Sequence, residues 1–291
     1  MFASIKRLTK NSAIYGIGHI FARSIAFFLL PIYTNFLSPD DFGVAVLLIS
    51  LLAILNIFYV YGMDSAFLRY YIEAESSQEK QEIFSTALWT IFTTALLLSS
   101  IGYLLSENVA EILFSDRDVA SLLKMCCGIL FFDGIAAILY LVLRAEEKSL
   151  HFVSLKSIAA IITLALNWLF IIAWGWGIDG IFWANLASAG ASVILILPFI
   201  LKKLAFAYSF TSLKMLLKFG LPYIPSTLSV ILMDVIDRFF IETFLGKSAV
   251  GLYGAGYRLG MLMALFVAAF RFAWHPFFLA TAKEANAKEI F

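Results

Sequence analysis

The sequence contains little charge for its length. Only 14% of its 291 residues are charged, against roughly 25% in an average soluble domain, while 62% are hydrophobic. The formal net charge of +1 lacks the basic excess expected of a nucleic-acid-binding protein. A water-soluble fold could not bury this much apolar surface. The composition therefore indicates an integral membrane protein without a nucleic-acid partner.

Cysteine and histidine are also scarce. Cys126 and Cys127 are adjacent in an apolar run, so packing explains them better than a disulfide framework or a metal site. The histidines lack metal-ligand spacing; they are His19, His151 and His275. Residues 246–248 (GKS) resemble the end of a phosphate-binding loop, but Ile241 stands where that motif needs glycine. We expect no catalytic residues, no metal and no cofactor, and hence no enzyme.

Long apolar runs fill most of the chain. About 20 apolar residues are needed to cross the hydrocarbon core of a bilayer. Eight such runs occur near residues 11–36, 42–63, 84–105, 119–143, 152–174, 180–200, 214–241 and 249–274. The length of the first run, and the polar His19 and Arg23 within it, favour a retained helix over a cleaved signal peptide. We predict an all-α, polytopic transmembrane bundle with about eight helices in this chain.

The positive charges are distributed unevenly between alternate loops. Three of them fall on one set of loops, namely Arg117, Arg238 and Lys247. Fifteen fall on the other set, namely Lys6, Arg7, Lys10, Arg69, Lys80, Arg144, Lys148, Lys156, Lys202, Lys203, Lys214, Lys218, Arg271, Lys283 and Lys288. Cytoplasmic loops carry the excess of Lys and Arg in membrane proteins. Both termini are therefore predicted to be cytoplasmic.

A short internal repeat suggests two lobes. Phe36, Leu37 and Gly43 recur 208 residues later as 244–245 (FL) and Gly251. Six spans separate the two occurrences, which is the pattern of two related six-helix lobes. Residues 1–205 would form the first lobe and residues 206–291 the start of the second. Because two helices cannot complete a lobe, we expect a fragment of a longer protein; a short protein that dimerises is the alternative.

Several motifs are similar to those of one transporter family. They are residues 218–225 (KFGLPYIP), 237–241 (DRFFI), 244–246 (FLG), 250–253 (VGLY), 37–43 (LSPDDFG), 62–66 (GMDSA) and 69–71 (RYY). Together they resemble the polysaccharide-transporter family, the flippases of O-antigen and exopolysaccharide. That family shares a superfamily with multidrug-extrusion antiporters and peptidoglycan-precursor flippases, and the resemblance covers essentially the whole chain.

The resemblance implies a two-lobed, alternating-access carrier of twelve to fourteen helices in a prokaryotic cytoplasmic (inner) membrane. The implied cargo is an undecaprenyl-diphosphate-linked oligosaccharide. Membrane lipids and polysaccharide-assembly proteins are the other implied partners. The chain ends after the eighth predicted helix, which departs from the family pattern.

Arg23 is the first candidate for lining a cargo cavity. It lies near the middle of the first span, where a lipid-facing charge costs about 2.5–3.5 kcal/mol. Helical spacing places Ser12, Gly16 and His19 on the same stripe. This stripe could be a cavity wall, or Arg23 could bond to a neighbouring helix. His19 alone is more consistent with a packed polar residue.

Arg258 in the eighth span is the matching candidate from the second lobe. Arginine forks bind diphosphate well, so Arg23 and Arg258 together predict a cationic cavity for the diphosphate or acidic sugars of the cargo. Close packing of a glycine-rich helix is the alternative for Arg258. Asp133 in the fourth span is a further cavity candidate, whereas Lys124 is better explained by snorkelling to the outer interface.

Two features of the seventh span have weaker functional interpretations. Pro222 and Pro225 interrupt its start and favour a kink, which could be a hinge, a cavity lining or simple helix entry. Asp234, Asp237 and Arg238 near its outer end have the spacing of a local ion pair that anchors a helix end.

We therefore expect a flippase whose lobes rock about a midplane cavity, giving a sugar-diphosphate headgroup a polar path across the hydrocarbon. Three alternatives remain open. The first is a multidrug or metabolite antiporter of the same fold. The second is a membrane-embedded sugar transferase or polymerase, which the short predicted outer loops disfavour. The third is a non-transporting membrane scaffold.

Overall fold

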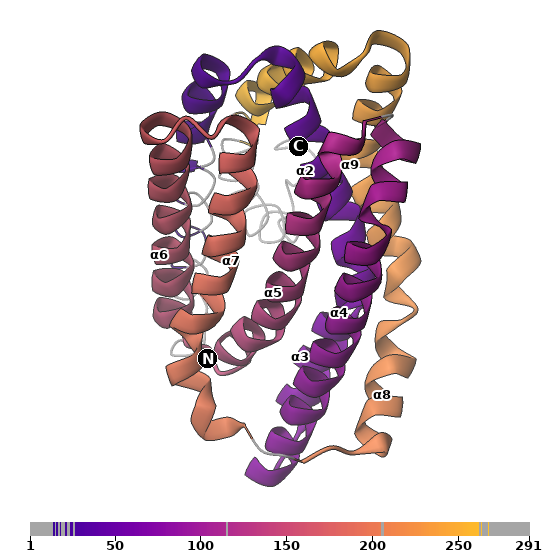
Figure 1. The fold of residues 1–291 in the computed structure, drawn as a ribbon. Coiled ribbons are helices and arrows are strands. Elements are labelled where there is room, and N and C mark those ends of the chain that lie inside the picture. The colour runs from indigo at the N-terminus through magenta and orange to yellow at the C-terminus, as the bar shows by residue number, and fades with distance from the viewer. Residues whose placement is uncertain are drawn as a thin grey trace, which may run out of the picture.

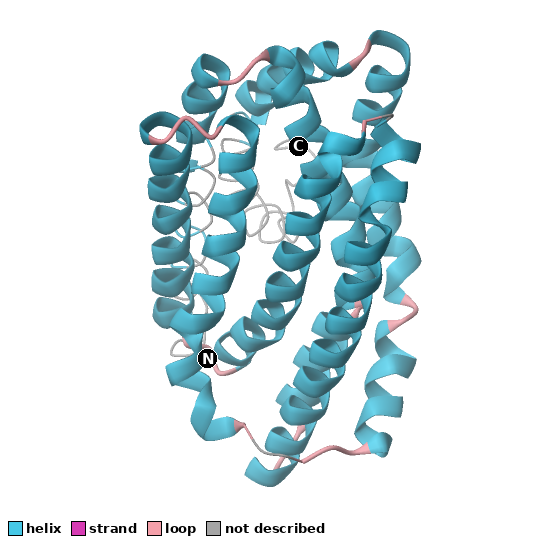
Figure 2. Cartoon of the chain, viewed as in Figure 1, coloured by secondary structure: helices cyan, strands magenta, loops and turns pink. Residues whose placement is uncertain are grey.

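The computed structural model describes residues 27–114, 116–204 and 207–261, together with the single residues Ile14, Gly16, Gly18, Phe21, Ser24, Ile25, Met263 and Val267. Helices account for nearly all of this part of the chain, and no strand occurs within it (Figure 2). The predicted all-α bundle is confirmed.

The first labelled helix, α2 (Pro39–Val60), begins where its sequence provides a helix start. The Ser38 hydroxyl accepts a hydrogen bond from the Asp41 backbone N–H, and Pro39 occupies the first turn. The helix ends at Tyr61, which adopts a left-handed conformation, and Gly62 follows with a φ of 74°. The glycine is the N-cap of the short helix α3 (Met63–Glu73), and its positive φ is one that glycine adopts readily.

Within the described ranges, five helical segments are long and apolar enough to span a membrane. They are α2, α4 (Ser77–Phe114), α5 (Ala120–Ala145) with the short turn η1 (Arg117–Val119), α6 (Ser149–Asn167) with the π-helical turn η2 (Trp168–Ala173), and α7 (Gly177–Ile200). The turn η3 (Leu201–Lys203) leads to a sixth, bent span formed by α8 (Phe210–Gly220) and α9 (Tyr223–Leu245). These six correspond to the second to seventh predicted spans.

The first and eighth predicted spans are described only in part. A helix covers Phe27–Phe36, and residues 247–261, called here the last described helix, are also helical. The predicted boundary of α4 was wrong, because its 38 residues extend well past 84–105 at both ends. At 1.5 Å per residue it is about 57 Å long, so polar turns at its ends continue the helix beyond a hydrocarbon core of about 30 Å.

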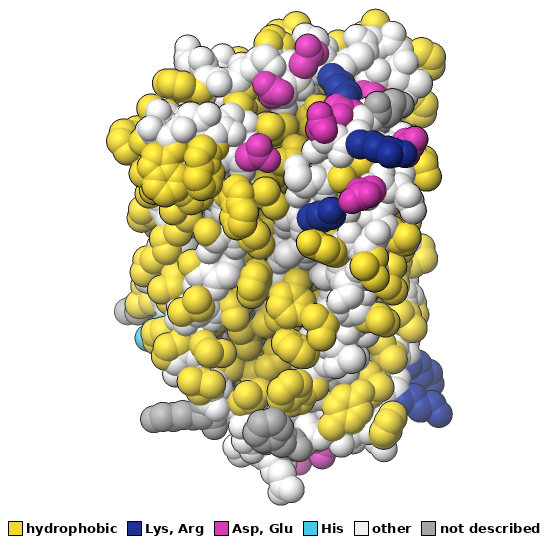
Figure 3. Space-filling view, in the orientation of Figure 1, with side chains coloured by type: hydrophobic (Ala, Val, Ile, Leu, Met, Phe, Trp, Pro, Cys, Tyr) yellow, Lys and Arg dark blue, Asp and Glu magenta, His cyan; other side chains and the backbone are white. Residues whose placement is uncertain are grey.

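Helix α5 is the centre of the bundle and packs against α2, α3, α4, α6 and α7. Figure 1 shows α6 and α7 side by side at the left and α8 at the right edge of the molecule. Helix α9 packs against α2, and α8 against α3 and α4. Apolar side chains cover the middle of the visible face, where acyl chains would surround it (Figure 3).

The two ends of the bundle differ in charge. The end at which α2, α5 and α7 begin is called here the acidic end; it carries Asp40, Asp41, Asp116, Asp118 and Asp179. Acidic side chains gather near the top of the view in Figure 3. The opposite end is called the basic end and carries Arg144, Lys148, Lys203, Lys214 and Lys218. Which end faces the cytoplasm stays a prediction.

Helix α2 meets the last described helix through glycines. A Cβ on Gly43 would lie 1.9 Å from the Lys247 carbonyl oxygen, and one on Gly251 would lie 2.2 Å from the Pro39 carbonyl oxygen. Gly43 and Gly251 are 208 residues apart, and so are Pro39 and Lys247. Each helix therefore makes the same contact with the other, and the contact is reciprocal. A two-fold axis between repeated elements produces such contacts. The lobe boundary at residue 205 stays a prediction.

Candidate functional site

Two of the predicted cavity residues, His19 and Arg23, lie outside the described residues. The structure therefore places only Asp133 and Arg258 of the cavity candidates, and both prolines of the candidate hinge. Their roles stay predictions.

Arg258 lies on the last described helix, and its guanidinium contacts the helix Phe27–Phe36 and the first turn of α2. Its Cζ atom is 5.2 Å from the ring centroid of Tyr33 and 5.1 Å from that of Phe42. Both distances are within the range of a cation–π contact. Among the described residues, no carboxylate lies within ion-pair distance of Arg258. The aromatic rings thus hold the guanidinium without neutralising it.

Arg238 on α9 is a second cation in the same region. Its Nη1 atom donates a hydrogen bond to the Ser50 hydroxyl on α2 at 3.0 Å, and its Cζ atom lies 4.8 Å from the Tyr257 ring centroid. Its buried Nε–H has no hydrogen-bond partner among the described residues. Tyr257 directly precedes Arg258, so the contact with its ring brings Arg238 into the same region as Arg258. We call Arg238 and Arg258 the arginine pair.

The predicted local ion pair of Arg238 is not formed within the described part of the chain. Asp237 instead accepts hydrogen bonds from the Tyr253 hydroxyl and from the Arg238 backbone N–H. The guanidinium of Arg238 donates to the buried Ser50 hydroxyl on α2 and lies against the Tyr257 ring of the last described helix. Sequence spacing along one helix missed this arrangement because the partners come from other helices.

A cavity of about 350 Å³ lies between α2, α5, α6 and α9, on the basic side of the bundle's middle. Its polar lining residues are Asn56, Asp64, Tyr140, Arg144, Lys156 and Thr227. The Lys156 ammonium lies 4.2 Å from the ring centroid of Tyr140, within cation–π range. We call this space the Lys156 cavity.

Asp133 lies beside this cavity on α5, one helical turn from the lining residue Ala137. Its side chain is exposed, and its charge interacts with that of Lys156. Sequence reasoning assigned Lys156 to a loop, and the structure corrects this by placing it in α6, which begins at Ser149. The apolar run that begins at Phe152 and contains Lys156 was the available signal, since a charge inside such a run faces a cavity or a partner.

The predicted kink occurs at Pro222. Helix α8 ends at Gly220, α9 begins at Tyr223, and the two axes differ by 45°. The break packs against the junction of α2 and α3, where a Cβ on Gly62 would lie 2.1 Å from the Gly220 carbonyl oxygen. Thr227, in the turn after Pro225, lines the Lys156 cavity. Hinge motion at these prolines stays a prediction.

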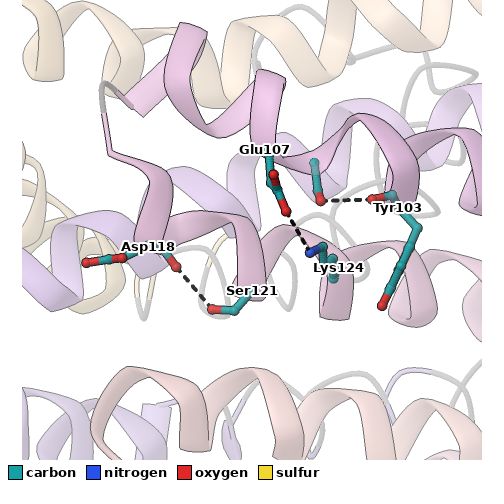
Figure 4. A network of polar contacts seen from close by, with 6 residues as sticks. Tyr103, Glu107, Asp118, Ser121 and Lys124 are labelled. Carbon is teal, nitrogen blue, oxygen red and sulfur yellow. Dashed lines mark hydrogen bonds and ion pairs between the residues drawn. The ribbon is translucent and has the colours of Figure 1, made fainter.

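Lys124 belongs to a separate polar network at the acidic end. Figure 4 shows its ammonium directed at Glu107, with an N–O distance of 3.3 Å. Tyr103 lies beside the ammonium, which is 5.4 Å from its ring centroid. This network ties α4 to α5 near their ends and contributes nothing to the Lys156 cavity. Within the described ranges, no group of three or more His, Cys, Asp or Glu side chains could hold a metal ion.

Comparison with known proteins identifies both a family and a fold. Residues 8–281 match the family model described as polysaccharide biosynthesis protein. No curated protein sequence matches the chain.

Three solved structures illustrate the likeness in fold. An inward-facing multidrug resistance MATE family transporter of the MOP superfamily is 19% identical with a TM-score of 0.64, over 82% of this chain and 58% of that one. The MATE multidrug transporter DinF-BH is 17% identical with a TM-score of 0.70, over 89% and 61%. A MOP superfamily transporter from Pyrococcus furiosus is 15% identical with a TM-score of 0.66, over 96% and 75%. The chain thus spans about three fifths of the length of the first two.

Proposed function

This chain belongs to the polysaccharide biosynthesis protein family, and from that premise we propose that it forms part of a flippase for lipid-linked oligosaccharides. It is a multi-pass membrane protein with the fold of MOP superfamily transporters, and neither its family nor its structural neighbours are enzymes. The proposed cargo is an undecaprenyl-diphosphate-linked oligosaccharide. The proposed location is a prokaryotic inner membrane with both termini in the cytoplasm, where membrane lipids and polysaccharide-assembly proteins would be its partners.

The arginine pair is the observation that carries this proposal. Two guanidinium groups lie in the region where α2 meets α9 and the last described helix, and neither forms an ion pair with a described residue. One such charge facing lipid costs about 2.5–3.5 kcal/mol. A ligand that neutralises both charges would offset that cost. An anion therefore fits this position better than a cationic or neutral compound does.

Diphosphate suits the geometry of two adjacent arginines. A guanidinium presents a planar fork of N–H donors that can bind two oxygens of one phosphate group. The rings of Tyr33, Phe42 and Tyr257 contact the guanidinium groups of the pair. A ring stacked on a guanidinium face leaves the N–H groups in the guanidinium plane available to a ligand.

The position between helices of the two predicted lobes supports a transport role. In an alternating-access carrier the lobes move relative to each other, so a ligand held at their contact is exposed to one side and then the other. Headgroup sugars and phosphates pay a large desolvation penalty in hydrocarbon, which a polar path removes. The lipid tail would stay in the bilayer throughout.

Export by the full-length protein in a flippase-deficient strain tests the proposal. Arg258→Ala should strongly reduce surface polysaccharide at unchanged membrane abundance, and Arg258→Lys should restore it only in part, because an ammonium keeps the charge but loses the planar fork. Lys124→Ala is the matched control, since it removes a membrane-helix cation that pairs with Glu107 away from the arginine pair. Normal export by Arg258→Ala at equal abundance would refute cargo binding by this residue.

A further inference from the structure

The Lys156 cavity and the arginine pair lie at different depths along α2. Ser50 contacts Arg238, whereas Asn56 and Val60 line the cavity nearer the basic end. The lining residue of α2 nearest to Ser50 is Ala53, about 4.5 Å away along the helix axis at 1.5 Å per residue, whereas the polar lining residue Asn56 is about 9 Å away. The polar groups of the cavity therefore lie nearer the basic end than the arginine pair does.

Two cations that line the cavity have no ion-pair partner in the described part of the chain. They are Lys156 on α6 and Arg144 in the last turn of α5. The carboxylates nearby are Asp64, which lines the cavity, and Asp133, whose charge acts on Lys156 from one turn further along α5. Neither carboxylate approaches either cation within 4 Å, since no such ion pair is formed among the described residues. Both cations are exposed to the cavity and can be reached by a ligand.

Neutral hydrogen-bonding groups from both α2 and α9, which pack against each other, complete the lining of the cavity. Asn56 comes from α2 and Thr227 from α9, while the Tyr140 ring fixes the Lys156 ammonium from α5. Amide and hydroxyl groups can donate to phosphate or carboxylate oxygens and can also bond to sugar hydroxyls. A volume of about 350 Å³ is at the small end of the range for ligand pockets, roughly 300–1,000 Å³. It can hold part of a headgroup but not a whole oligosaccharide.

We propose that the Lys156 cavity is a second oxyanion site, which takes a phosphate or carboxylate group of the cargo headgroup at the basic side before the arginine pair receives it. The inference rests on the proposed function for the identity of the cargo. The shared chemistry is an oxyanion beside hydroxyl groups, which either the diphosphate or an acidic sugar of the headgroup can supply. Lys156 and Arg144 provide the charge, and Asn56 and Thr227 provide hydrogen bonds from opposite sides.

Binding to the purified full-length protein in nanodiscs tests this site directly. The Arg258→Ala variant is used as the background, so that binding at the arginine pair is weakened. Calorimetric titrations at constant ionic strength use inorganic diphosphate in one arm and glucuronate in the other. Lys156→Gln and Arg144→Gln should each weaken binding of at least one probe by about tenfold or more, because a charged hydrogen-bonding group is lost.

Two further variants separate this role from effects on folding. Lys156→Arg should retain most of the affinity, since it keeps the charge. Lys148→Gln should bind like the background protein, because Lys148 pairs with Glu146 on the exposed loop after α5 and does not line the cavity. Thermal unfolding of each variant is measured in parallel.

The outcomes distinguish this inference from the proposed function. An effect on diphosphate alone identifies the phosphate as the group bound, and an effect on glucuronate alone identifies the sugar carboxylate. Unchanged affinity of both Lys156→Gln and Arg144→Gln for both probes, in folded protein, overturns the second site. That result would leave the proposed flippase intact if Arg258→Ala still strongly reduces export.

Discussion

At the scale of single residues, the arginine pair contains one of the two buried side-chain groups that lack a hydrogen-bond partner in the described structure, the other being the Tyr140 hydroxyl. The Nε–H of Arg238 has no partner among the described residues, whereas its Nη1 atom donates to the Ser50 hydroxyl. Ser50 is itself buried and also donates to the Val46 carbonyl oxygen of its own helix. This serine therefore links α2 to α9 through a charged hydrogen bond.

Ser50→Ala should lower the free energy of unfolding by about 1–3 kcal/mol, because the Arg238 guanidinium would lose this acceptor in a buried position. Unfolding of the purified protein in detergent, followed by denaturant titration, measures the change. Ser229→Ala is the control, since that exposed hydroxyl donates to the Pro225 carbonyl oxygen of its own helix. Equal stability of the two variants would contradict a structural role for the Ser50 contact.

The candidate site was only partly predictable from sequence. Arg258 and Asp133 stood out because each is a charge inside a long apolar run. Arg238 was misassigned to an anchor with neighbouring aspartates, because spacing along α9 says nothing about Ser50 on α2. Lys156 was missed because it lies in the first turns of its span and was counted with the loop cations, although the apolar run from Phe152 contains it.

At the scale of helices, apolar runs located the spans well but not their ends. Helix α4 extends from Ser77 to Phe114 because its polar end turns remain helical outside the hydrocarbon core. Hydropathy marks only the apolar part of such a helix, so it did not locate these ends. The π-helical turn at Trp168–Ala173 had no signal in the sequence. There Phe170 stacks on both Trp174 and Trp176, a tertiary arrangement of aromatic rings that residue type alone does not specify.

Gly43→Ala should destabilise the protein by about 1–3 kcal/mol or more, because the new methyl group would meet backbone that cannot move aside without separating the helices. Gly251→Ala should have a similar effect, since its contact is the reciprocal one. Thermal unfolding in detergent measures both.

The matched control for these glycines is Gly256→Ala on the same helix as Gly251. No described atom lies within 4 Å of a Cβ placed there, so the substitution should be neutral or stabilise the helix by about 0.5–1 kcal/mol. A destabilisation of Gly256→Ala as large as that of Gly43→Ala would show that the close backbone contact is not what makes Gly43 and Gly251 intolerant of a Cβ.

At the scale of the whole molecule, the separation of charge between the ends predicts its orientation in the membrane. Lys and Arg dominate the basic end, which the positive-inside rule assigns to the cytoplasm. Single cysteines are introduced by Lys148→Cys at the basic end and Asp118→Cys at the acidic end, after Cys126 and Cys127 are replaced by alanine.

In intact cells, an impermeant maleimide should label the Asp118→Cys variant, and should label the Lys148→Cys variant only after permeabilisation. Both positions are exposed, so a difference in labelling reports the side of the membrane. The opposite pattern would invert the orientation and place the Lys156 cavity on the outer side.

The reciprocal contact of Gly43 and Gly251 has a consequence for the ancestry of the protein. If the two helices descend from one duplicated gene, the ancestral dimer met itself at a single glycine, and one mutation there would have altered both sides of the contact at once. After fusion into one chain, the same requirement applies to two separate codons. Drift at either codon is then constrained by the unchanged backbone of the other helix, so both glycines should persist even where the surrounding repeats have lost all other identity.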